Sequence, residues 1–285
     1  MQRGRTDGIA TSDAVHSAGA SGGRRKRRGV KHLTSLLATA LLMGTAAAPL
    51  VTHSAQALGV GQTVDLRVLL ITGEGRYFTS GVDIAGMQGN LGEGTDGVVR
   101  GSNARRQYRF RAHHDLFDEL EQIEKPVVLA AQSHCFGVGI ELGVSCDFRL
   151  AAQGATFSLP EVENLAVIPG SGGISRLTRL VGPHWARWLA MAGQTIDASQ
   201  AQAIGLVHDV YPTDEFAERA RAFARHLAAL PREAVGLAKV AIDIAASVDR
   251  RTAREFDRLA NSSLFGSPEY RQKVEAFMQR GKRPT

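Results

Sequence analysis

The sequence predicts an α/β protein in which strands and helices alternate along the chain and the strands pair in parallel. Two patterns support this fold class. Short apolar runs at residues 68–72, 127–131 and 148–151 are typical of buried strands. Between and after them, apolar residues recur at three- and four-residue intervals, as in helices packed on a sheet. With 285 residues, 44% of them hydrophobic, the chain can bury a sizeable core.

The first predicted elements follow one another closely. The run Val68–Thr72 predicts a buried strand that ends at Gly73. Residues 86–103 contain six glycines and predict a mobile loop. Apolar and histidine side chains at helical spacing over residues 110–123 then predict a helix that ends before Pro126.

The rest of the chain continues this alternation. Strands are predicted at residues 127–131, 148–151 and 156–159, with a buried helix at 140–146. A helix follows the glycines of residues 170–173, and the pattern from residue 197 onward is helical apart from a strand-like break at 206–210. We therefore divide the chain into an atypical extension (1–63), a core (64–210) and a C-terminal helical region (211–285).

The net charge of +6 resides in the first 33 residues. They hold eight basic and two acidic residues, which leaves 26 of each sign in the remainder. The globular part therefore carries no bulk charge signal for nucleic acid, and none is expected as a partner.

The N-terminal extension has an unusual composition. Residues 1–29 are rich in Gly, Ser, Ala and Arg and are predicted to be disordered. A basic run at 24–31, an apolar stretch at 33–51 and the small residues Ala55 and Ala57 together look like a secretory signal. The apolar stretch is marginal for a membrane span, and no membrane association is expected. Three interpretations remain open: an export or transit peptide, an amphipathic helix of the fold over Leu33–Ala48, or an extension that arises from a misplaced start or a shifted frame.

Several reactive side chains have ordinary interpretations. Cys135 and Cys146 lie in apolar surroundings without metal-ligand spacing, which predicts buried reduced thiols and no metal site. The histidines at 113, 114 and 134 form no ligand pattern and are interpreted as surface or core residues. Asp147 and Arg149 flank a strand and are expected to form a structural ion pair.

Three glycine-containing loops are candidates for chemistry. Residues 78–84 follow a buried strand, where ligands bind in α/β sheets. Residues 137–141 combine two glycines with a helix start, whose free N–H groups suit an oxyanion. Pro160-Glu161 and the glycines of residues 170–173 form the third. Each loop alone can equally be a plain turn, and Glu141 alone can be a partner of the helix dipole.

Taken in order, these stretches resemble the crotonase family, the enoyl-CoA hydratase/isomerase superfamily. The resemblance runs from about Arg67 to Pro284. It is carried by the loop Phe78–Ile84, by the segments from Lys125 to Arg149 and from Pro160 to Leu177, and by the stretches 192–196 and 201–207. It implies a crotonase-like ββα-superhelix core followed by a C-terminal helical trimerisation region.

The resemblance also implies a site and a reaction. Family members bind acyl-CoA thioesters, with coenzyme A as part of the substrate and no separate cofactor. The two backbone N–H groups of the oxyanion hole correspond to Val82 and Val138, and the acid–base pair of the hydratases corresponds to Glu141 and Glu161. The second oxyanion residue is usually Gly in this family, but the N–H survives its replacement by Val. The residues expected to contact substrate are Ser80, Gly81, Asp83, Ile84, Gly137, Gly139, Pro160 and Gly170.

The presence of both glutamates favours hydration of a 2-enoyl-CoA, and double-bond isomerisation, another crotonase reaction or a truncated non-catalytic member are the alternatives. The resemblance implies a homotrimer or a dimer of trimers. CoA chemistry favours a cytoplasmic location, while the signal-like N-terminus leaves export open.

The chain departs from the family in two further places. Residues 1–64 show no first strand and no Asn-containing CoA loop, so the sheet is expected to have an unpaired edge with weakened CoA binding. There is also one extra residue between Glu161 and Pro169, which affects the placement of Glu161.

Overall fold

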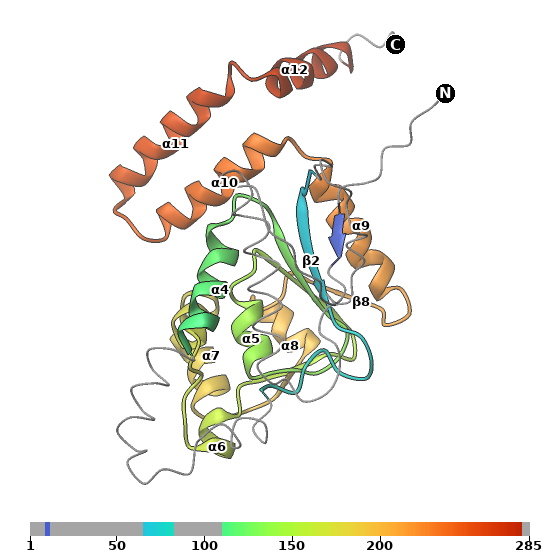
Figure 1. Cartoon of the computed structure of the whole chain (residues 1–285), viewed down its shortest axis with the longest axis vertical. Helices are drawn as coiled ribbons and strands as arrows, with labels where there is room; N and C mark the ends of the chain where they lie inside the picture. The colour runs from blue at the N-terminus through green and yellow to red at the C-terminus, as the bar shows by residue number, and fades with distance from the viewer. Residues whose placement is uncertain (1–8, 12–64, 83–109, 281–285) are drawn as a thin grey trace, which may run out of the picture.

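The computed structural model describes residues 9–11, 65–82 and 110–280. Its centre is a parallel sheet of five strands in the order β1-β2-β3-β5-β8 (Figure 1). The strands are β1 (Ile9–Thr11), β2 (Val68–Thr72), β3 (Val127–Ala131), β5 (Phe148–Ala152) and β8 (Asp209–Tyr211). The α/β class and the parallel pairing predicted from the sequence are confirmed.

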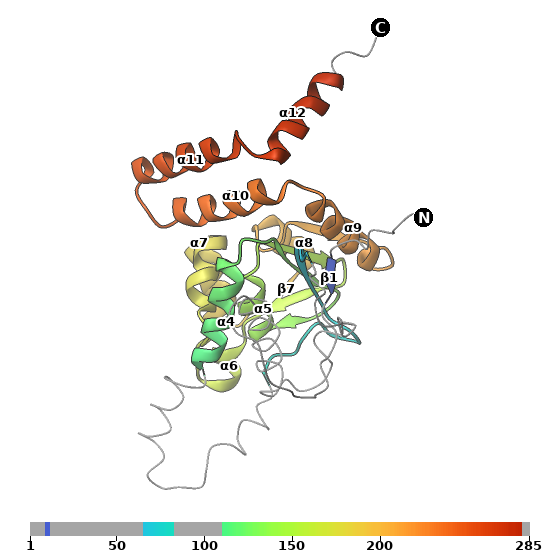
Figure 2. The same cartoon turned by 45° about the horizontal axis from the view of Figure 1, so that its top comes forward.

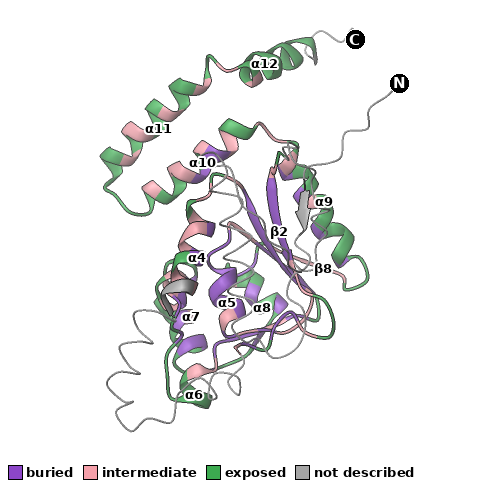
Figure 3. Ribbon diagram, viewed as in Figure 1, coloured by how far each residue is buried: buried purple, intermediate pink, exposed green. Residues whose placement is uncertain are grey.

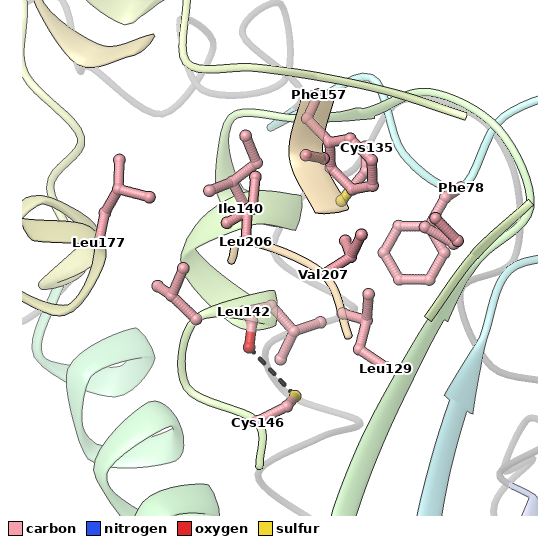
Figure 4. Close-up of a cluster of buried hydrophobic side chains, with 14 of the residues drawn as sticks. Phe78, Leu129, Cys135, Ile140, Leu142, Cys146, Phe157, Leu177, Leu206 and Val207 are labelled. Atoms are coloured by element: carbon pink, nitrogen blue, oxygen red, sulfur yellow. Dashed lines mark hydrogen bonds between the residues drawn. The ribbon is translucent and has the colours of Figure 1, made fainter. Parts of the chain in front are cut away.

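Alternate residues of the strands enter two separate cores, because successive side chains of a strand point to opposite faces. Leu69, Ile71 and Leu129 face the larger core, which Figure 4 shows in part. Leu70 and Val128 face the smaller one. Because both faces are covered, β2 and β3 read as continuous apolar runs rather than alternating ones.

Helices cover both faces of the sheet. On the larger core lie α4 (Phe110–Gln122), α5 (Val138–Gly143), α7 (Gly173–Ala190) and α8 (Ala198–Ala203). On the opposite face α9 (Phe216–Ala228) packs its buried side chains against β2, β3 and β5. The largest of these side chains is Phe216. No helix within the described residues is long and apolar enough to cross a membrane.

A smaller sheet extends the core towards the loops of the predicted site. It contains β4 (Cys135–Phe136), β6 (Thr156–Ser158) and β7 (Ile196–Asp197) in the order β4-β6-β7. Helix α6 (Glu161–Leu165) follows β6 after two residues. Strand β4 ends at Phe136, so it is followed directly by Gly137 and by helix α5.

The C-terminal region is helical, as predicted, and extends away from the sheet (Figure 2). It comprises α10 (Arg232–Ala245), α11 (Arg250–Leu264) and α12 (Pro268–Arg280). Figure 3 shows mainly exposed surface along α11 and α12. Large apolar side chains are among the exposed residues, including Leu259 (67%), Phe277 (76%) and Met278 (60%).

Two expectations about the sheet need correction. Ile9–Thr11 forms β1 and pairs with β2 in parallel, so the edge of β2 that was expected to be unpaired is occupied, and the predicted disorder of residues 1–29 is wrong for these three residues. The strand predicted within residues 206–210 is shifted towards the C-terminus: it spans Asp209–Tyr211, and Leu206 and Val207 before it are buried but irregular. The other interpretations of residues 1–63, including a signal or a helix over Leu33–Ala48, and the loop 86–103 lie outside the described residues.

The expected ion pair between Asp147 and Arg149 is also wrong. Asp147 Oδ2 lies 2.9 Å from Lys239 Nζ and accepts the Val127 N–H at 2.7 Å. Arg149 is buried and donates instead to backbone carbonyls, those of Gly143, Cys146 and Leu206. Asp147 lies just before β5, which begins at Phe148, and each of the two side chains has tertiary partners in place of the other.

The prediction of buried free thiols is confirmed. Cys135 and Cys146 are both buried and unpaired with each other (Figure 4). The Cys146 Sγ–H donates to the carbonyl of Leu142. Burial raises the pKa of both thiols, that of Cys146 to about 12, so they stay protonated and inert at neutral pH.

Candidate functional site

The loop after β2 is fixed to β4 by backbone hydrogen bonds. The Thr79 N–H donates to the carbonyl of His134 at 2.9 Å, and the Phe136 N–H donates to the carbonyl of Thr79 at 3.1 Å. The Thr79 hydroxyl oxygen accepts the Gly81 N–H at 3.2 Å. Gly81 has a φ of 108°, a conformation open to glycine. These bonds hold the loop so that Gly81, which precedes Val82, lies close to Gly137 before helix α5.

Gly137 is the point where the three candidate loops meet. Its φ of 56° and ψ of −121° suit glycine. A Cβ at this position would lie 2.9 Å from Glu161 Oε1 and 3.5 Å from Gly81 Cα. A side chain here would therefore displace the Glu161 carboxyl group.

Two backbone donors of the predicted oxyanion hole have no acceptor within the part of the chain that the structure describes. Among the described residues, neither the Val82 nor the Val138 N–H donates to a backbone or side-chain acceptor. Val138 is the first residue of α5, so its N–H belongs to the unpaired first turn of the helix. Its side chain packs against the larger core, which accommodates the Val in place of the usual Gly.

Gly139 and Gly173 allow close packing around these donors. A Cβ at Gly139 would lie 2.3 Å from the Thr79 Cγ2, and one at Gly173 would lie 2.5 Å from the Glu141 Cγ. Neither position can hold a larger residue without displacing its neighbour. Because Gly139 has no side chain, helix α5 can lie directly against Thr79.

Glu141 projects from the first turn of α5 and is 4% exposed. Its Oε1 accepts the backbone N–H groups of Ser171 at 2.7 Å and Gly173 at 3.1 Å. Burial raises the pKa of Glu141, while the two N–H donors and the positive charges of His114 and Arg176 oppose that rise. One oxygen of the carboxyl is thus fixed in place and the ionised form is assisted.

Glu161 is the first residue of α6 and lies partly buried. Burial, and then the negative charge of Glu141, raise its pKa to about 6. Its Oε2 is buried and has no hydrogen-bond partner among the described residues. Two carboxyl groups that influence one another, one anchored and one unpartnered, suit a site that moves protons.

The expected contact residues are distributed unevenly. Gly137 lies close to both Gly81 and Glu161, whereas Gly139 lies against Thr79. Pro160 precedes α6, and Gly170 opens the loop that donates to Glu141. Ser80 is exposed. Asp83 and Ile84 lie outside the described residues.

Sequence reasoning missed the groups that hold Glu141. The amides of Ser171 and Gly173 donate to it, and His114 and Arg176 contact the same loop. The glycine-rich loop before a helix was recognised, but its partner was not identified. The available signal was the four-residue spacing of His114 and Asp118, which places both side chains on one face of α4.

Comparison with known proteins gives a consistent result. The model of the enoyl-CoA hydratase/isomerase family matches residues 45–284, so its match begins before Arg67. The chain is similar to the short-chain-enoyl-CoA hydratase of Clostridium acetobutylicum, with 33% identity over 76% of this chain and 79% of that protein. It is 31% identical to the 2,3-dehydroadipyl-CoA hydratase of Escherichia coli over 75% of this chain and 79% of that protein.

Solved structures agree with these relatives. An enoyl-CoA hydratase from Bacillus anthracis superposes with a TM-score of 0.69 at 28% identity, covering 88% of this chain and 86% of that one. An enoyl-CoA hydratase subunit from Geobacillus kaustophilus superposes with a TM-score of 0.67 at 31% identity, covering 77% and 80%.

Proposed function

Because the chain belongs to the enoyl-CoA hydratase/isomerase family, we propose that it adds water across the double bond of a 2-enoyl-CoA thioester. The observation that carries this proposal is the pair of interacting carboxyl groups, Glu141 and Glu161. It is supported by two backbone N–H groups, those of Val82 and Val138, that have no acceptor among the described residues. The pair supplies a base and an acid, and the N–H groups supply a hole for a developing oxyanion.

The thioester oxygen is assigned to the N–H groups of Val82 and Val138. When water attacks Cβ, the electrons of the double bond move towards the thioester carbonyl, whose oxygen gains negative charge. Donors fixed before the reaction stabilise this enolate without reorganising, and each such donor is typically worth about 10²–10³ in rate. The unpaired N–H at the start of α5 also benefits from the positive end of the helix.

The two glutamates receive different roles from their surroundings. Glu141, with two N–H donors on one oxygen, acts as the base that takes a proton from the attacking water. Glu161, with a pKa of about 6 and an unpartnered oxygen, delivers its proton to Cα. The water oxygen ends on Cβ and a proton on Cα, and transfer of a proton from Glu141 to Glu161 restores the starting state.

The assay is the loss of the absorbance of crotonyl-CoA on hydration. We expect activity in the wild-type chain and a fall of at least about 10²-fold in kcat for Glu141→Gln and for Glu161→Gln. Each amide preserves the shape of the side chain but removes proton transfer. Unchanged activity in both variants would contradict the assignment of the pair.

A double-bond isomerase is the second candidate, because a single carboxyl group with a raised pKa can shuttle a proton between two carbon atoms of the substrate. Glu161 fits that description without Glu141. A 3-enoyl-CoA substrate separates the two functions: an isomerase loses activity in Glu161→Gln but keeps it in Glu141→Gln. A hydratase loses the hydration of crotonyl-CoA in both variants.

The quaternary state proposed for the chain is a homotrimer or a dimer of trimers. The support is the apolar surface on α11 and α12, where Leu259 and Phe277 are largely exposed in the single chain. Coenzyme A enters only as part of the acyl-CoA substrate.

A further inference from the structure

In the loop that donates to Glu141, three successive backbone carbonyls each accept a hydrogen bond from a side chain. The acceptor oxygens belong to Gly170, Ser171 and Gly172. Their donors are, in that order, His114 Nε2 at 2.8 Å, Arg176 Nη1 at 3.2 Å and Ser175 Oγ at 2.9 Å. The first and third of these peptide groups are the ones whose N–H groups reach Glu141.

His114 and Glu141 sit at opposite ends of one peptide group. His114 Nε2 must carry the hydrogen, because a carbonyl oxygen can only accept. The carbonyl of Gly170 and the N–H of Ser171 share one planar amide, so fixing the oxygen fixes the direction of the N–H. A donor on the oxygen also polarises the amide and strengthens the hydrogen bond that its N–H makes.

The helix that carries His114 is tied to the same loop by ion pairs. His114, Asp118 and Glu121 lie on one face of α4 because they are four and three residues apart. Arg176 bonds Glu121 through Nε and Nη2, both at 2.8 Å, and also contacts Asp118. Such two-point pairing fixes the guanidinium group, and so it fixes α4 against the start of α7.

We propose that His114 is a positioning residue for hydration: it holds the Gly170–Ser171 peptide so that the Ser171 N–H stays directed at Glu141 Oε1. This role rests on the proposed hydratase function. His114 does not touch the reacting atoms in this role, and it acts on Glu141 only through the peptide group.

A test of this role must distinguish the effect of the hydrogen bond from the effect of the charged groups that face Glu141. Arg176 and His114 lower the pKa of Glu141, and Glu161 is its acidic neighbour. His113, beside His114 on α4, is the other titratable group in electrostatic contact with that imidazole. Any replacement of His114 by a neutral residue removes the imidazole charge, so two neutral replacements that differ only in a donor isolate the bond.

The test compares His114→Gln with His114→Leu. Gln keeps an N–H donor that can reach the Gly170 carbonyl, whereas Leu fills a similar volume without one. We expect His114→Leu to lower kcat about tenfold with KM changed less than about twofold, and His114→Gln to stay within about threefold of wild type, in line with outer-sphere partners elsewhere. His113→Leu, which removes an imidazole that contacts Phe117, is the matched control and should leave kcat unchanged.

A second readout does not depend on activity. The Glu141 carboxyl is titrated by ¹³C NMR, with its signal assigned by its loss in Glu141→Gln. We expect a higher apparent pKa for Glu141 in His114→Leu than in His114→Gln, because the polarised N–H favours the ionised form. Equal Glu141 titrations and equal kcat values in the two variants would overturn the role of His114. A wild-type chain without hydratase activity would reject the proposed function alone, because the titration still reports the hydrogen bond.

Discussion

Ala166 ends helix α6 in a left-handed conformation, with φ 52° and ψ 33°. It is the one residue other than glycine with positive φ among the described residues. A side chain in this conformation costs about 1–2 kcal/mol, which glycine avoids. The extra residue between Glu161 and Pro169 lies in this same stretch, so the strain sits next to the predicted acid.

We expect Ala166→Gly to raise the free energy of unfolding by about 1 kcal/mol, less the entropy that glycine adds to the unfolded chain. Urea unfolding measures this change in the free energy of unfolding, provided that the m-value stays constant. Ala222→Gly, in the exposed interior of α9, is the control and should lower stability by up to about 1 kcal/mol. A loss of stability in both variants would show that Ala166 is not strained.

The acid role of Glu161 predicts a pH dependence. A carboxyl group whose pKa is raised to about 6 is protonated below that pH and loses its proton as the pH rises through it. We therefore expect kcat/KM for hydration to fall as the pH rises above about 6. Glu163→Gln, an exposed neighbour on α6, should leave this limb in place. A rate that increases through pH 6 to 8 would make Glu161 the base instead.

At the residue scale, the sequence predicted which glutamates to examine but not what surrounds them. The spacing of Glu141 and Glu161 and the glycines before α5 were sufficient to nominate the site. The partners of Glu141 come from α4 and from the start of α7, about 30 residues away on either side. Such contacts depend on how helices pack, which local pattern does not specify.

At the scale of the element, helix α10 docks on the core through an unusual pair of residues. Its buried residues are Gly236 and Lys239. A Cβ at Gly236 would lie 3.2 Å from the Glu124 carbonyl oxygen, which explains the glycine. Lys239 Nζ donates to the carbonyl of Leu120 at 2.8 Å and pairs with Asp147 at 2.9 Å. One ammonium group thus ties the C-terminal helices to α4 and to the start of β5.

Removing this ammonium group should leave the partly buried carboxylate of Asp147 with only the Val127 N–H as a donor. We expect Lys239→Met to lower the free energy of unfolding by about 3–5 kcal/mol, as measured by urea unfolding. Asp147→Asn in the same chain should recover part of the loss, because a neutral amide oxygen can still accept the Val127 N–H. If the two changes were simply additive in a double-mutant cycle, the pair would not be coupled.

The long elements and the three-residue strand β6 could be predicted from the sequence, whereas the two-residue strands and β1 could not. The strands at 68–72 and 127–131 are apolar throughout because both of their faces are buried, and that pattern is distinctive. Strands β4 and β7 have two residues each, too few for any period to appear. Strand β1 lies in a segment rich in Gly, Ser and Arg and is recognisable only by its pairing with β2.

At the scale of the whole molecule, the exposed apolar side chains of α11 and α12 are the support for the proposed assembly. Sedimentation velocity of the wild-type chain should give the mass of a trimer or of a dimer of trimers. We expect Leu259→Glu combined with Phe277→Glu to shift the chain towards monomer, because charges in an apolar contact are costly. Gln272→Glu, at an exposed polar position of α12, is the control and should leave the mass of the assembly unchanged. A monomeric wild-type chain would reject the proposed assembly.

The pairing of β1 with β2 joins residues 9–11 to residues 68–70 across a long intervening stretch of chain. The Leu69 N–H points the other way, to the carbonyl of Pro126. Alternation along the strand then directs the amides of Val68 and Leu70 towards β1. Opening of β1 alone would free these two amides while their neighbours stay protected. Native-state deuterium uptake should therefore alternate along this strand, faster at Val68 and Leu70 than at Leu69 and Ile71.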